Sequence, residues 1–545
     1  MTQRFALFVL LIASITRAFC CTSLIATPGA STTGSSMVTY AADAHTLYGA
    51  LYHQPAADHA PGTMRAVTDW DTGQHRGYIP EVPHTYSTVG NMNEHGLTIA
   101  ESTWGGRPEL EGSGMIDYGS LIYITLQRAK TAREAIDVMT QLVNDYGYAS
   151  EGESFSIADP DEVWVLELIG KGKADKGAVW VARRVPDGYI SGHANHSRIH
   201  KFPLNDPETL YSPDVISFAR EQGLYDGADE DFDFSRTYAI TDVLALRGCD
   251  ARVWSYFRRF TPEGQMDAYT PWILKGEGEI MPLWVKPDKK LSANDLKWMM
   301  RDHFEGTILD MTQDIGAGPF DVPYRWRPMG FVVDGNEYTH ERAIATQQTG
   351  FSFVADMNKA RPDAAKGILW FGVDDANTCA YVPVFSSLDK VPRSLDEKTA
   401  DLLTLNWDSM FWVNNYVANQ AYNRYSQMIP DIRRVQGALE QDMETAADQA
   451  VKTVADMTDD EAAEYLNALT DYWAEKTTAD YHKLGDYLLV KFLDGNIKKE
   501  KDGQFERNPQ GVPVQPTFGG YNERYFRSIA ESTGDRFIIG KATEE

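Results

Sequence analysis

The sequence has little cysteine and little positive charge for its length. Four cysteines occur among 545 residues, and 51 basic residues stand against 78 acidic ones, which leaves a formal net charge of −27. A surface of that sign repels polyphosphate and anionic lipid, so the composition argues against a nucleic-acid partner. Internal repeats and low-complexity tracts are also missing, which excludes solenoid and fibrous architectures.

Apolar runs long enough to span a bilayer are missing too. The most apolar segment, Phe5–Ile15, is too short for a membrane helix and follows a short basic start, as in a secretory signal peptide. Signal peptidase needs small residues one and three positions before its cut, and Cys20 and Ala18 meet that need. We therefore expect residues 1–20 to be removed. The mature chain would begin at Cys21 and be secreted or periplasmic, without a membrane partner.

Loss of Cys20 would leave three cysteines in an oxidising compartment, and three is an odd number. One interpretation is a disulfide between Cys249 and Cys379, with Cys21 as a free functional thiol. The alternative is that Cys249 and Cys379 are two buried, reduced cysteines. The sequence does not decide between these two interpretations.

Residues 21–390 alternate between strand and helix patterns. Helix is expected from Tyr118 to Leu142, with a second helix starting at Thr131, because Thr131 and Glu134 have the spacing of a capping box. The alternation of paired strands and helices favours a layered α+β core. The expected strands are Ser23–Ala26, Ser36–Tyr40, Leu97–Glu101, Ser154–Ala158, Val163–Leu168, Val179–Arg183 and Gly188–Ser191.

Residues 391–545 have a different character. Helices are predicted over Ser394–Arg424 and Asp431–Met457, and a third helix opens at Thr458, which has capping-box spacing to Glu461. The tail from about Lys498 is rich in glycine, proline and charge, and we expect it to be extended. The chain thus divides into a signal peptide (1–20), a core (21–390) and a helical C-terminal extension with a tail (391–545).

A cysteine that begins a mature chain can act as a complete catalytic unit. Its α-amino group has a pKa of about 7.7–8.0, close to the value of about 8.5 for the thiol. The amine can therefore accept the thiol proton and later deliver it to a leaving amine, so that no histidine is required. Cys21 is the candidate nucleophile on this reasoning.

Several segments of the mature chain, in a fixed order, resemble peptidase family C69, whose members are cysteine dipeptidases. The resemblance covers residues 21–390 well and the helical remainder loosely. It implies an N-terminal-nucleophile hydrolase fold: an αββα four-layer sandwich, here with a C-terminal helical extension. It also implies dipeptides or short peptides as substrates, and no metal or organic cofactor. The segments are Cys21-Thr22-Ser23, Gly34-Ser35-Ser36-Met37, Gly90–Leu97, Asp117–Leu121, Arg128–Ala135, Lys286–Lys290 and Arg301–Thr307.

Comparison with the related penicillin V acylase and bile salt hydrolase branch implies further site residues. Asp43 falls where that branch has an aspartate at the nucleophile's amine, and Asn195 and Thr103 fall at its oxyanion positions. Arg252 matches an arginine of both branches, as a thiolate partner or a clamp for a substrate carboxylate. Tyr40 departs from the pattern, because the branch has an arginine there, and thiolate stabilisation by that guanidinium cannot be assumed.

Alternatives stay open at this point. The chain resembles hydrolases of other linear amides as well, namely N-acyl amino acids, penicillin V or conjugated bile acids. A catalytically silent secreted binding protein on the same fold is a second alternative, which the substitution at Tyr40 favours. Asn195 also begins a glycosylation sequon, Asn195-His196-Ser197. The chain is a possible homo-oligomer.

Overall fold

A computed structural model describes residues 21–173 and 175–540, so the expected signal peptide lies outside the described residues. Within the described part the fold is mixed α/β and contains two large sheets, whose paired strands are all antiparallel. No helix in this part is both long enough and apolar enough to cross a membrane.

The first sheet has seven strands, and the N-terminal strand lies near its centre. β1 (Ser23–Ala26) pairs with β14 on one side and with β2 on the other, so both of its edges are hydrogen-bonded. Every residue of β1 and β2 is buried, as expected for a sheet covered on both faces. The strand order is β16 (Trp284–Val285), β14 (Ile190–His193), β1, β2 (Ser36–Asp43), β19 (Thr349–Met357), β20 (Gly367–Val373) and β21 (Val382–Phe385).

The second sheet has eight strands and contains most of the other strands expected from the sequence. Its central strands β11 and β12 are buried throughout, and β12 is a nearly continuous apolar run, as expected for a strand covered on both faces. The order is β15 (Thr209–Tyr211), β13 (Ala178–Arg184), β12 (Val163–Gly170), β11 (Gly152–Ala158), β10 (Thr98–Trp104), β9 (Met92–Asn93), β8 (Thr88–Val89) and β3 (His53–Gln54).

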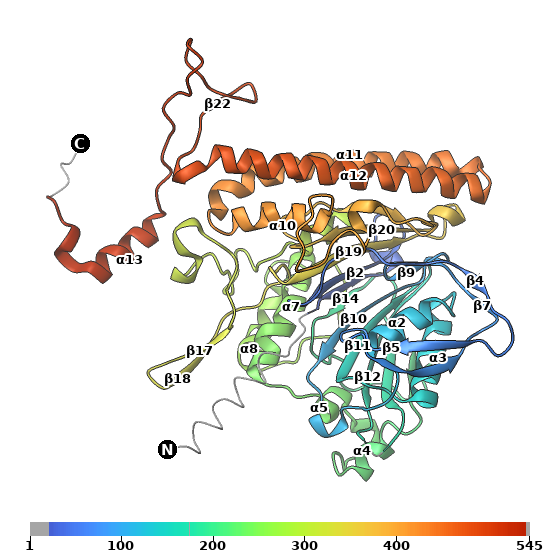
Figure 1. The fold of residues 1–545 in the computed structure, drawn as a ribbon. Coiled ribbons are helices and arrows are strands. Elements are labelled where there is room, and N and C mark those ends of the chain that lie inside the picture. The colour runs from blue at the N-terminus through green and yellow to red at the C-terminus, as the bar shows by residue number, and fades with distance from the viewer. Residues whose placement is uncertain (1–20, 174, 541–545) are drawn as a thin grey trace.

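The two sheets pack face to face, with β1 and β2 against β10 and β11 (Figure 1). Helices α2 (Tyr118–Leu126) and α3 (Ala132–Tyr146) cover the outer face of the eight-stranded sheet. The predicted helix start at Thr131 is confirmed, because its hydroxyl accepts a hydrogen bond from the Glu134 N–H at 3.3 Å. The outer face of the seven-stranded sheet is covered by α10 (Met410–Ala421), α11 (Tyr425–Thr453) and α12 (Asp459–Lys491).

The long helices agree with the sequence prediction only in part. The capping box at the start of α12 is confirmed, because Thr458 and Glu461 exchange their hydrogen bonds. The helix predicted from Ser394 is wrong over its first half: α10 begins at Met410, capped by Ser409. The preceding residues form turns, because Asp396, Asp401 and similar side chains bond to nearby main-chain N–H groups and compete with a helix.

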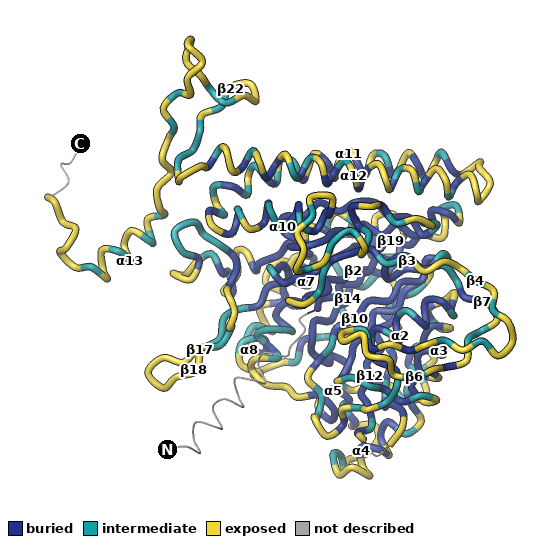
Figure 2. Tube along the Cα trace, viewed as in Figure 1, coloured by how far each residue is buried: buried dark blue, intermediate teal, exposed yellow. Residues whose placement is uncertain are grey.

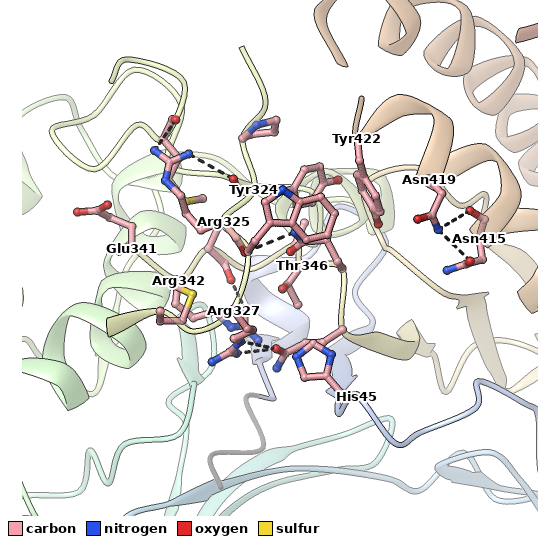
Figure 3. Close-up of a pocket in the computed structure, with 18 residues that line it drawn as sticks. His45, Tyr324, Arg325, Arg327, Glu341, Arg342, Thr346, Asn415, Asn419 and Tyr422 are labelled. Carbon is pink, nitrogen blue, oxygen red and sulfur yellow. Dashed lines mark hydrogen bonds between the residues drawn. The ribbon is translucent and has the colours of Figure 1, made fainter. Parts of the chain in front are cut away.

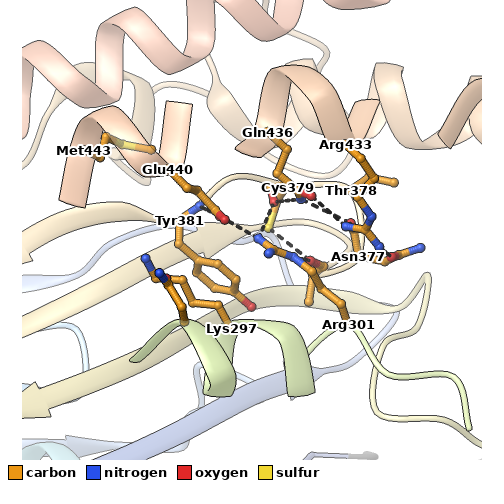
Figure 4. Close-up of polar contacts among 12 residues, drawn as sticks. Lys297, Arg301, Asn377, Thr378, Cys379, Tyr381, Arg433, Gln436, Glu440 and Met443 are labelled. Carbon is orange, nitrogen blue, oxygen red and sulfur yellow. Dashed lines mark hydrogen bonds and ion pairs between the residues drawn. The ribbon is translucent and has the colours of Figure 1, made fainter. Parts of the chain in front are cut away.

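Ion pairs connect α11 to α9 (Ala293–Met299) and to the segment that follows α9 (Figure 4). The Arg301 guanidinium donates to Glu440 of α11 at 2.5 Å, and the Lys297 ammonium donates to Glu444 at 3.0 Å. Lys297 is only 1% exposed and lies 3.6 Å from the centre of the Trp370 ring on β20. The helical layer therefore shares one continuous core with the sheet, in which residues of α11 and α12 belong to the same cluster as β1.

Two segments project from the body and are largely exposed (Figure 2): the hairpin of β17 (Gly330–Val333) and β18 (Asn336–Thr339), and the tail. The prediction of a purely extended tail is wrong, because it contains the helix α13 (Glu523–Thr533), capped by Asn522. The disulfide considered between Cys249 and Cys379 is not formed either. Cys379 is a free, buried thiol, and burial raises its pKa well above the usual range.

Candidate active site

Cys21 lies directly before β1 and faces a cavity of about 310 Å³. Its neighbour Thr22 forms an antiparallel bridge with Ala41, with the Ala41 N–H donating to the Thr22 carbonyl at 2.9 Å. Cys21 is thereby held opposite the C-terminal end of β2. Only 4% of its surface is exposed, so the cavity is the way by which a ligand reaches the sulfur.

Tyr40 connects the sulfur to the opposite sheet. Side chains alternate along a strand, so Tyr40 and Ala42 point from β2 to the same side, and both line the cavity. The Tyr40 hydroxyl lies 3.6 Å from the Cys21 sulfur and donates a hydrogen bond to Glu101 of β10. Two phenylalanines of β19 hold the tyrosine ring, each with its ring centre 5.7 Å away: Phe351 and Phe353.

The Cys21 thiol lies in surroundings that disfavour its ionised form. Burial raises the pKa of the thiol well above its usual range, and the carboxylates of Glu101 and Asp43 raise it further. A hydrogen bond from the Asp43 main-chain N–H and the contact with the Tyr40 hydroxyl act in the opposite direction. These surroundings therefore favour the neutral thiol over the thiolate.

A pair of buried carboxyl groups lies behind Tyr40. Glu101 and Glu153 are 1% and 0% exposed, and Oε2 of Glu101 and Oε1 of Glu153 are buried without another hydrogen-bond partner among the described residues. A proton on one of the two carboxyl groups would satisfy both atoms. Burial raises the pKa of both groups, and the negative charge of Glu101 adds to the shift of Glu153. The Oε2 atom of Glu153 accepts from Thr103 at 3.1 Å and from Tyr148 at 3.4 Å. The pair thus places one negative charge next to the thiol.

Asp43, at the end of β2, is held in place by partners from a distant part of the chain. It is 1% exposed, forms an ion pair with Arg342, and accepts a hydrogen bond from the Thr349 hydroxyl at 2.6 Å. The two partners come 299 and 306 residues later in the chain. Asp43 lines the same cavity as Cys21.

Arg252, in α7 (Ala251–Phe260), contacts the main chain on the other side of Cys21. It is fully buried, and its guanidinium donates to the Cys21 carbonyl and to the Thr22 hydroxyl, both at 2.6 Å. It also donates to the Asn195 side-chain oxygen at 2.9 Å and to the Ala194 carbonyl at 3.1 Å. The guanidinium therefore positions the chain around Cys21.

Asn195 is fixed in a conformation that few residues adopt. Its φ of 58° lies in the left-handed region, which asparagine tolerates better than other residues with a side chain. Its side-chain nitrogen donates to the Thr103 carbonyl at 2.6 Å, while its oxygen accepts from Arg252. Arg252, Asn195 and Thr103 thus form one network behind Cys21. None of the three is among the residues that line the cavity in the described part of the chain.

His193, near Asn195, bonds to serines. It is fully buried on β14, with its ring nitrogens 2.7 Å from the Ser102 hydroxyl and 2.9 Å from that of Ser156. Burial lowers the pKa of His193 to about 3, and the charges of Arg198 and Arg252 contribute to the same shift, so the ring is neutral. This histidine joins the two sheets and has the character of a structural residue.

The outer wall of the cavity is aromatic. Trp70 packs between Tyr52 and Tyr123, with ring centres 5.3 and 4.8 Å away. Gly119 in the first turn of α2 permits this approach, because a Cβ atom there would lie 2.5 Å from Trp70. The segment Asp117–Leu121 therefore serves two purposes, since the Asp117 carboxylate also caps α2 by accepting from the Ser120 N–H at 2.8 Å.

The charged lining of the cavity is of one sign. Among the described residues that line it, those with a charged side chain are Asp43, Asp71, Glu101 and Glu397. Asp71 accepts a hydrogen bond from the Tyr118 hydroxyl at 2.8 Å, and burial raises its pKa. A thiol at one end and carboxylates along the wall suit a ligand that carries a positive charge close to an electrophilic carbon.

Three residues of this arrangement were not predicted from the sequence: Glu101, Glu153 and Arg342. A carboxylate inside an otherwise apolar strand, as in Leu97–Glu101, was the available signal for Glu101. The same signal is present for Glu153 on β11. Arg342 lies in a loop far along the chain, and nothing in its local sequence distinguishes it.

Comparison with known proteins adds a family and relatives. The family model described as Peptidase family C69 matches residues 20–438 of this chain. A protein of Latilactobacillus sakei named "Probable dipeptidase" is 24% identical over 492 residues, which are 84% of this chain and 95% of that protein.

Two further relatives are similar over a smaller share of the chain. A "Probable dipeptidase" of Salmonella dublin is 25% identical over 412 residues, 71% of this chain and 85% of that protein. A "Probable dipeptidase A" of Streptococcus pyogenes serotype M18 (strain MGAS8232) is 24% identical over 449 residues, 76% of this chain and 84% of that protein.

Proposed function

The chain belongs to peptidase family C69, and from that membership we propose that it is a dipeptidase with the Cys21 thiol as its nucleophile. The names of the relatives support the substrate class, since the L. sakei protein aligns along most of both chains. Two face-to-face antiparallel sheets between helical layers support the expected αββα sandwich of N-terminal-nucleophile hydrolases.

The observation that carries this proposal is the acidic lining of the cavity next to a thiol. A dipeptide has a protonated α-amine on the same residue as its scissile carbonyl, and Asp71 or Glu397 is a suitable counter-charge for it. An N-acylated substrate has no such charge and would meet carboxylates without a partner. The lining therefore favours a dipeptidase over a hydrolase of N-acyl amino acids, penicillin V or bile acids.

The α-amine of Cys21 is the base in this mechanism. Removal of residues 1–20 during export would free that amine, which has a pKa of about 7.7–8.0 in model peptides. Burial and the neighbouring carboxylates raise the pKa of the thiol, so little thiolate forms before the substrate arrives. Transfer of the proton during the attack is what such a thiol requires.

The reaction then follows two half-steps. The sulfur bonds to the scissile carbonyl carbon while the amine takes the thiol proton. The carbon–nitrogen bond breaks, and the leaving amine takes that proton, which leaves a thioester. Water attacks the thioester, passing a proton through the amine to the sulfur, and the acid is released. We assign the oxyanion contact to main-chain N–H groups next to Cys21, and to Asn195 and Arg252 the positioning of the chain that carries them.

Paired substrates test the proposal. Alanyl-alanine should be hydrolysed, and N-acetyl-alanyl-alanine should react at least about tenfold more slowly, because it lacks the ammonium group. Cys21→Ala should fold, as judged by an unchanged circular dichroism spectrum, and lose turnover of both. Cys21→Ser should retain only a trace, since a hydroxyl is a poorer nucleophile than a thiol.

Two outcomes would overturn the proposal. Preference for the N-acetylated peptide would favour the amidase alternative, and full activity of Cys21→Ala would exclude Cys21 as the nucleophile.

A third experiment addresses the alternative of a catalytically silent binding protein. Reaction of Cys21 with iodoacetamide, blocked by a saturating dipeptide, is expected of an enzyme. An inert sulfur together with no turnover would support the binding protein.

A further inference from the structure

A second cavity, of about 380 Å³, lies beside the cavity of Cys21 (Figure 3). Its walls come from parts of the chain that are distant in sequence: residues 323–329, residues 341–348, and the face of α10 that carries Asn415 and Asn419. His45, which lies in the segment that follows β2, also lines this cavity. The mechanism proposed above does not use this cavity.

The two cavities share a wall formed by the segment after β2. Ala44 and Thr46 line the Cys21 cavity, whereas His45 between them lines the second one. The ion pair of Asp43 and Arg342 crosses the same wall, with Asp43 on the side of Cys21 and Arg342 on the other side. The cavities are therefore neighbours but separate, and a ligand in one is distinct from a ligand in the other.

The lining charges of the two cavities are opposite in sign. Three arginines, Arg325, Arg327 and Arg342, line the second cavity against one carboxylate, Glu341, which forms an ion pair at 2.6 Å with Arg247 outside the lining. Arg325 and Arg342 also form ion pairs with carboxylates outside the lining, Asp314 and Asp43. The arginine charges affect the pKa of His45. Its pKa is lowered by burial first and then by the charges of Arg327 and Arg342. A positive lining of this kind suits an anionic ligand.

The guanidinium groups are held in fixed orientations. Arg325 donates to the Met311 carbonyl and to Asp314, both at 2.8 Å. Arg327 donates to the Gln348 side-chain oxygen, from Nε at 3.2 Å and from Nη2 at 2.5 Å. A planar guanidinium that is fixed in this way is oriented in advance for a carboxylate. The donors are thus arranged before a ligand arrives.

The remaining lining combines uncharged polar side chains with apolar and aromatic ones. Met311, Met329 and Trp326 belong to the apolar part, and the Tyr422 ring faces Trp326 from the end of α10, 5.9 Å between ring centres. An inorganic anion would leave these groups without contact, whereas an aliphatic side chain next to a carboxylate would cover them. The combination describes an apolar amino acid or a short peptide, bound by its carboxylate end.

We propose that this second cavity is a binding site for the carboxylate group of an apolar amino acid derivative or short peptide, separate from the cavity of Cys21. Arg327 is its main anion contact, and Trp326 with the methionines receives the side chain. The site does not depend on the proposed reaction, since no part of it includes the Cys21 thiol.

Calorimetric titration with N-acetyl-L-leucine tests this site. The probe has a carboxylate but no ammonium group, so the acidic cavity of Cys21 disfavours it, and the full chain with Cys21→Ala removes any turnover. We expect saturable binding that weakens about tenfold in Arg327→Gln, which removes one charge-assisted contact. Asn419→Asp, which adds a carboxylate on an exposed position of the wall, should weaken it similarly.

Controls distinguish this site from non-specific binding and from the cavity of Cys21. Arg527→Gln, on the exposed face of α13, should leave binding unchanged, as should Asp71→Asn in the other cavity. N-acetyl-L-leucinamide, which is neutral, should not bind. Absence of binding, or binding that responds to Asp71→Asn but not to Arg327→Gln, would overturn the proposal. Equal competition by inorganic phosphate would overturn the assignment to a carboxylate with an apolar side chain.

Discussion

The Arg252 guanidinium donates a hydrogen bond to the main-chain carbonyl of Cys21 at 2.6 Å, across 231 positions of sequence. The same guanidinium reaches Asn195, so the chain before β1 and the chain after β14 are held by a single side chain. A fully buried arginine in this position acts on the geometry of the nucleophile, since a contact with a substrate carboxylate would need an exposed guanidinium.

Arg252→Lys should therefore lower kcat while leaving KM nearly unchanged. Lysine has a single donor group in place of the guanidinium fork, so several buried acceptors around Cys21 lose their partners. We expect a loss of about 2–4 kcal/mol in the free energy of unfolding. Steady-state kinetics with urea denaturation measure both effects. A raised KM with an intact kcat would instead identify Arg252 as a substrate clamp.

Tyr40→Phe tests the link between the sulfur and the carboxyl pair. The hydroxyl helps to lower the thiol pKa, so its removal should slow alkylation of Cys21 by iodoacetamide at pH 8, by about threefold to tenfold. Glu101 loses a buried donor, which should destabilise the fold by about 1–2 kcal/mol. Tyr78→Phe, at an exposed ring, is the matched control and should change neither quantity. Unchanged alkylation in Tyr40→Phe would show that the hydroxyl does not act on the sulfur.

Glu153→Gln should stabilise the protein at neutral pH and less so in acid. The folded-state pKa of Glu153 is raised, so its contribution to stability is complete below the unfolded pKa of about 4.3 and is lost as the pH rises towards the folded value. Glutamine has no carboxyl group, so it stays neutral at this position at every pH. Its amide can donate to Glu101 and accept from Thr103. Urea unfolding at pH 4.5 and pH 8 measures the difference, and an equal gain at both pH values would contradict the assignment.

An extra residue before Cys21 should abolish turnover. It would convert the basic α-amine into an amide and fill space next to the sulfur, although every side chain remains in place. A chain with a retained methionine before Cys21, verified by mass spectrometry, should be inactive, and aminopeptidase removal of that methionine should restore activity. In the mature chain kcat/KM should fall as the pH drops through the pKa of the amine, about 7.7–8.0. Full activity of the extended chain would rule out the amine as base.

Elements whose signals are local could be predicted from the sequence. β1 has the bounds that were expected, and Thr131 and Thr458 cap the helices that they were expected to cap. The helix expected from Ser394 does not form over its first half, because local side-chain hydrogen bonds hold that segment in turns. The spacing of apolar residues along the sequence does not reveal such bonds.

Residues of the candidate site could be predicted from the sequence only where they matched a family pattern. Cys21 and Asp43, two residues named from that pattern, line one cavity. Glu153 and Arg342 were not expected. Arg342 is buried because Asp43 pairs with it, and Glu153 is buried next to Glu101, which raises its pKa; both neighbours are remote in sequence. Such pairings follow from the tertiary fold and leave no periodic pattern.

The central position of β1 and β2 also sets the order in which the protein can be made. β2 pairs along its whole length with β19, and the first of these contacts joins Ser36 to Met357. A growing chain therefore cannot complete the strand that carries Tyr40 until more than half of it has been synthesised, and such distant pairings form slowly. Until then an apolar strand edge stays open to other chains. We expect that versions truncated before β19 aggregate, and that folding chaperones of the compartment engage the nascent protein during this interval.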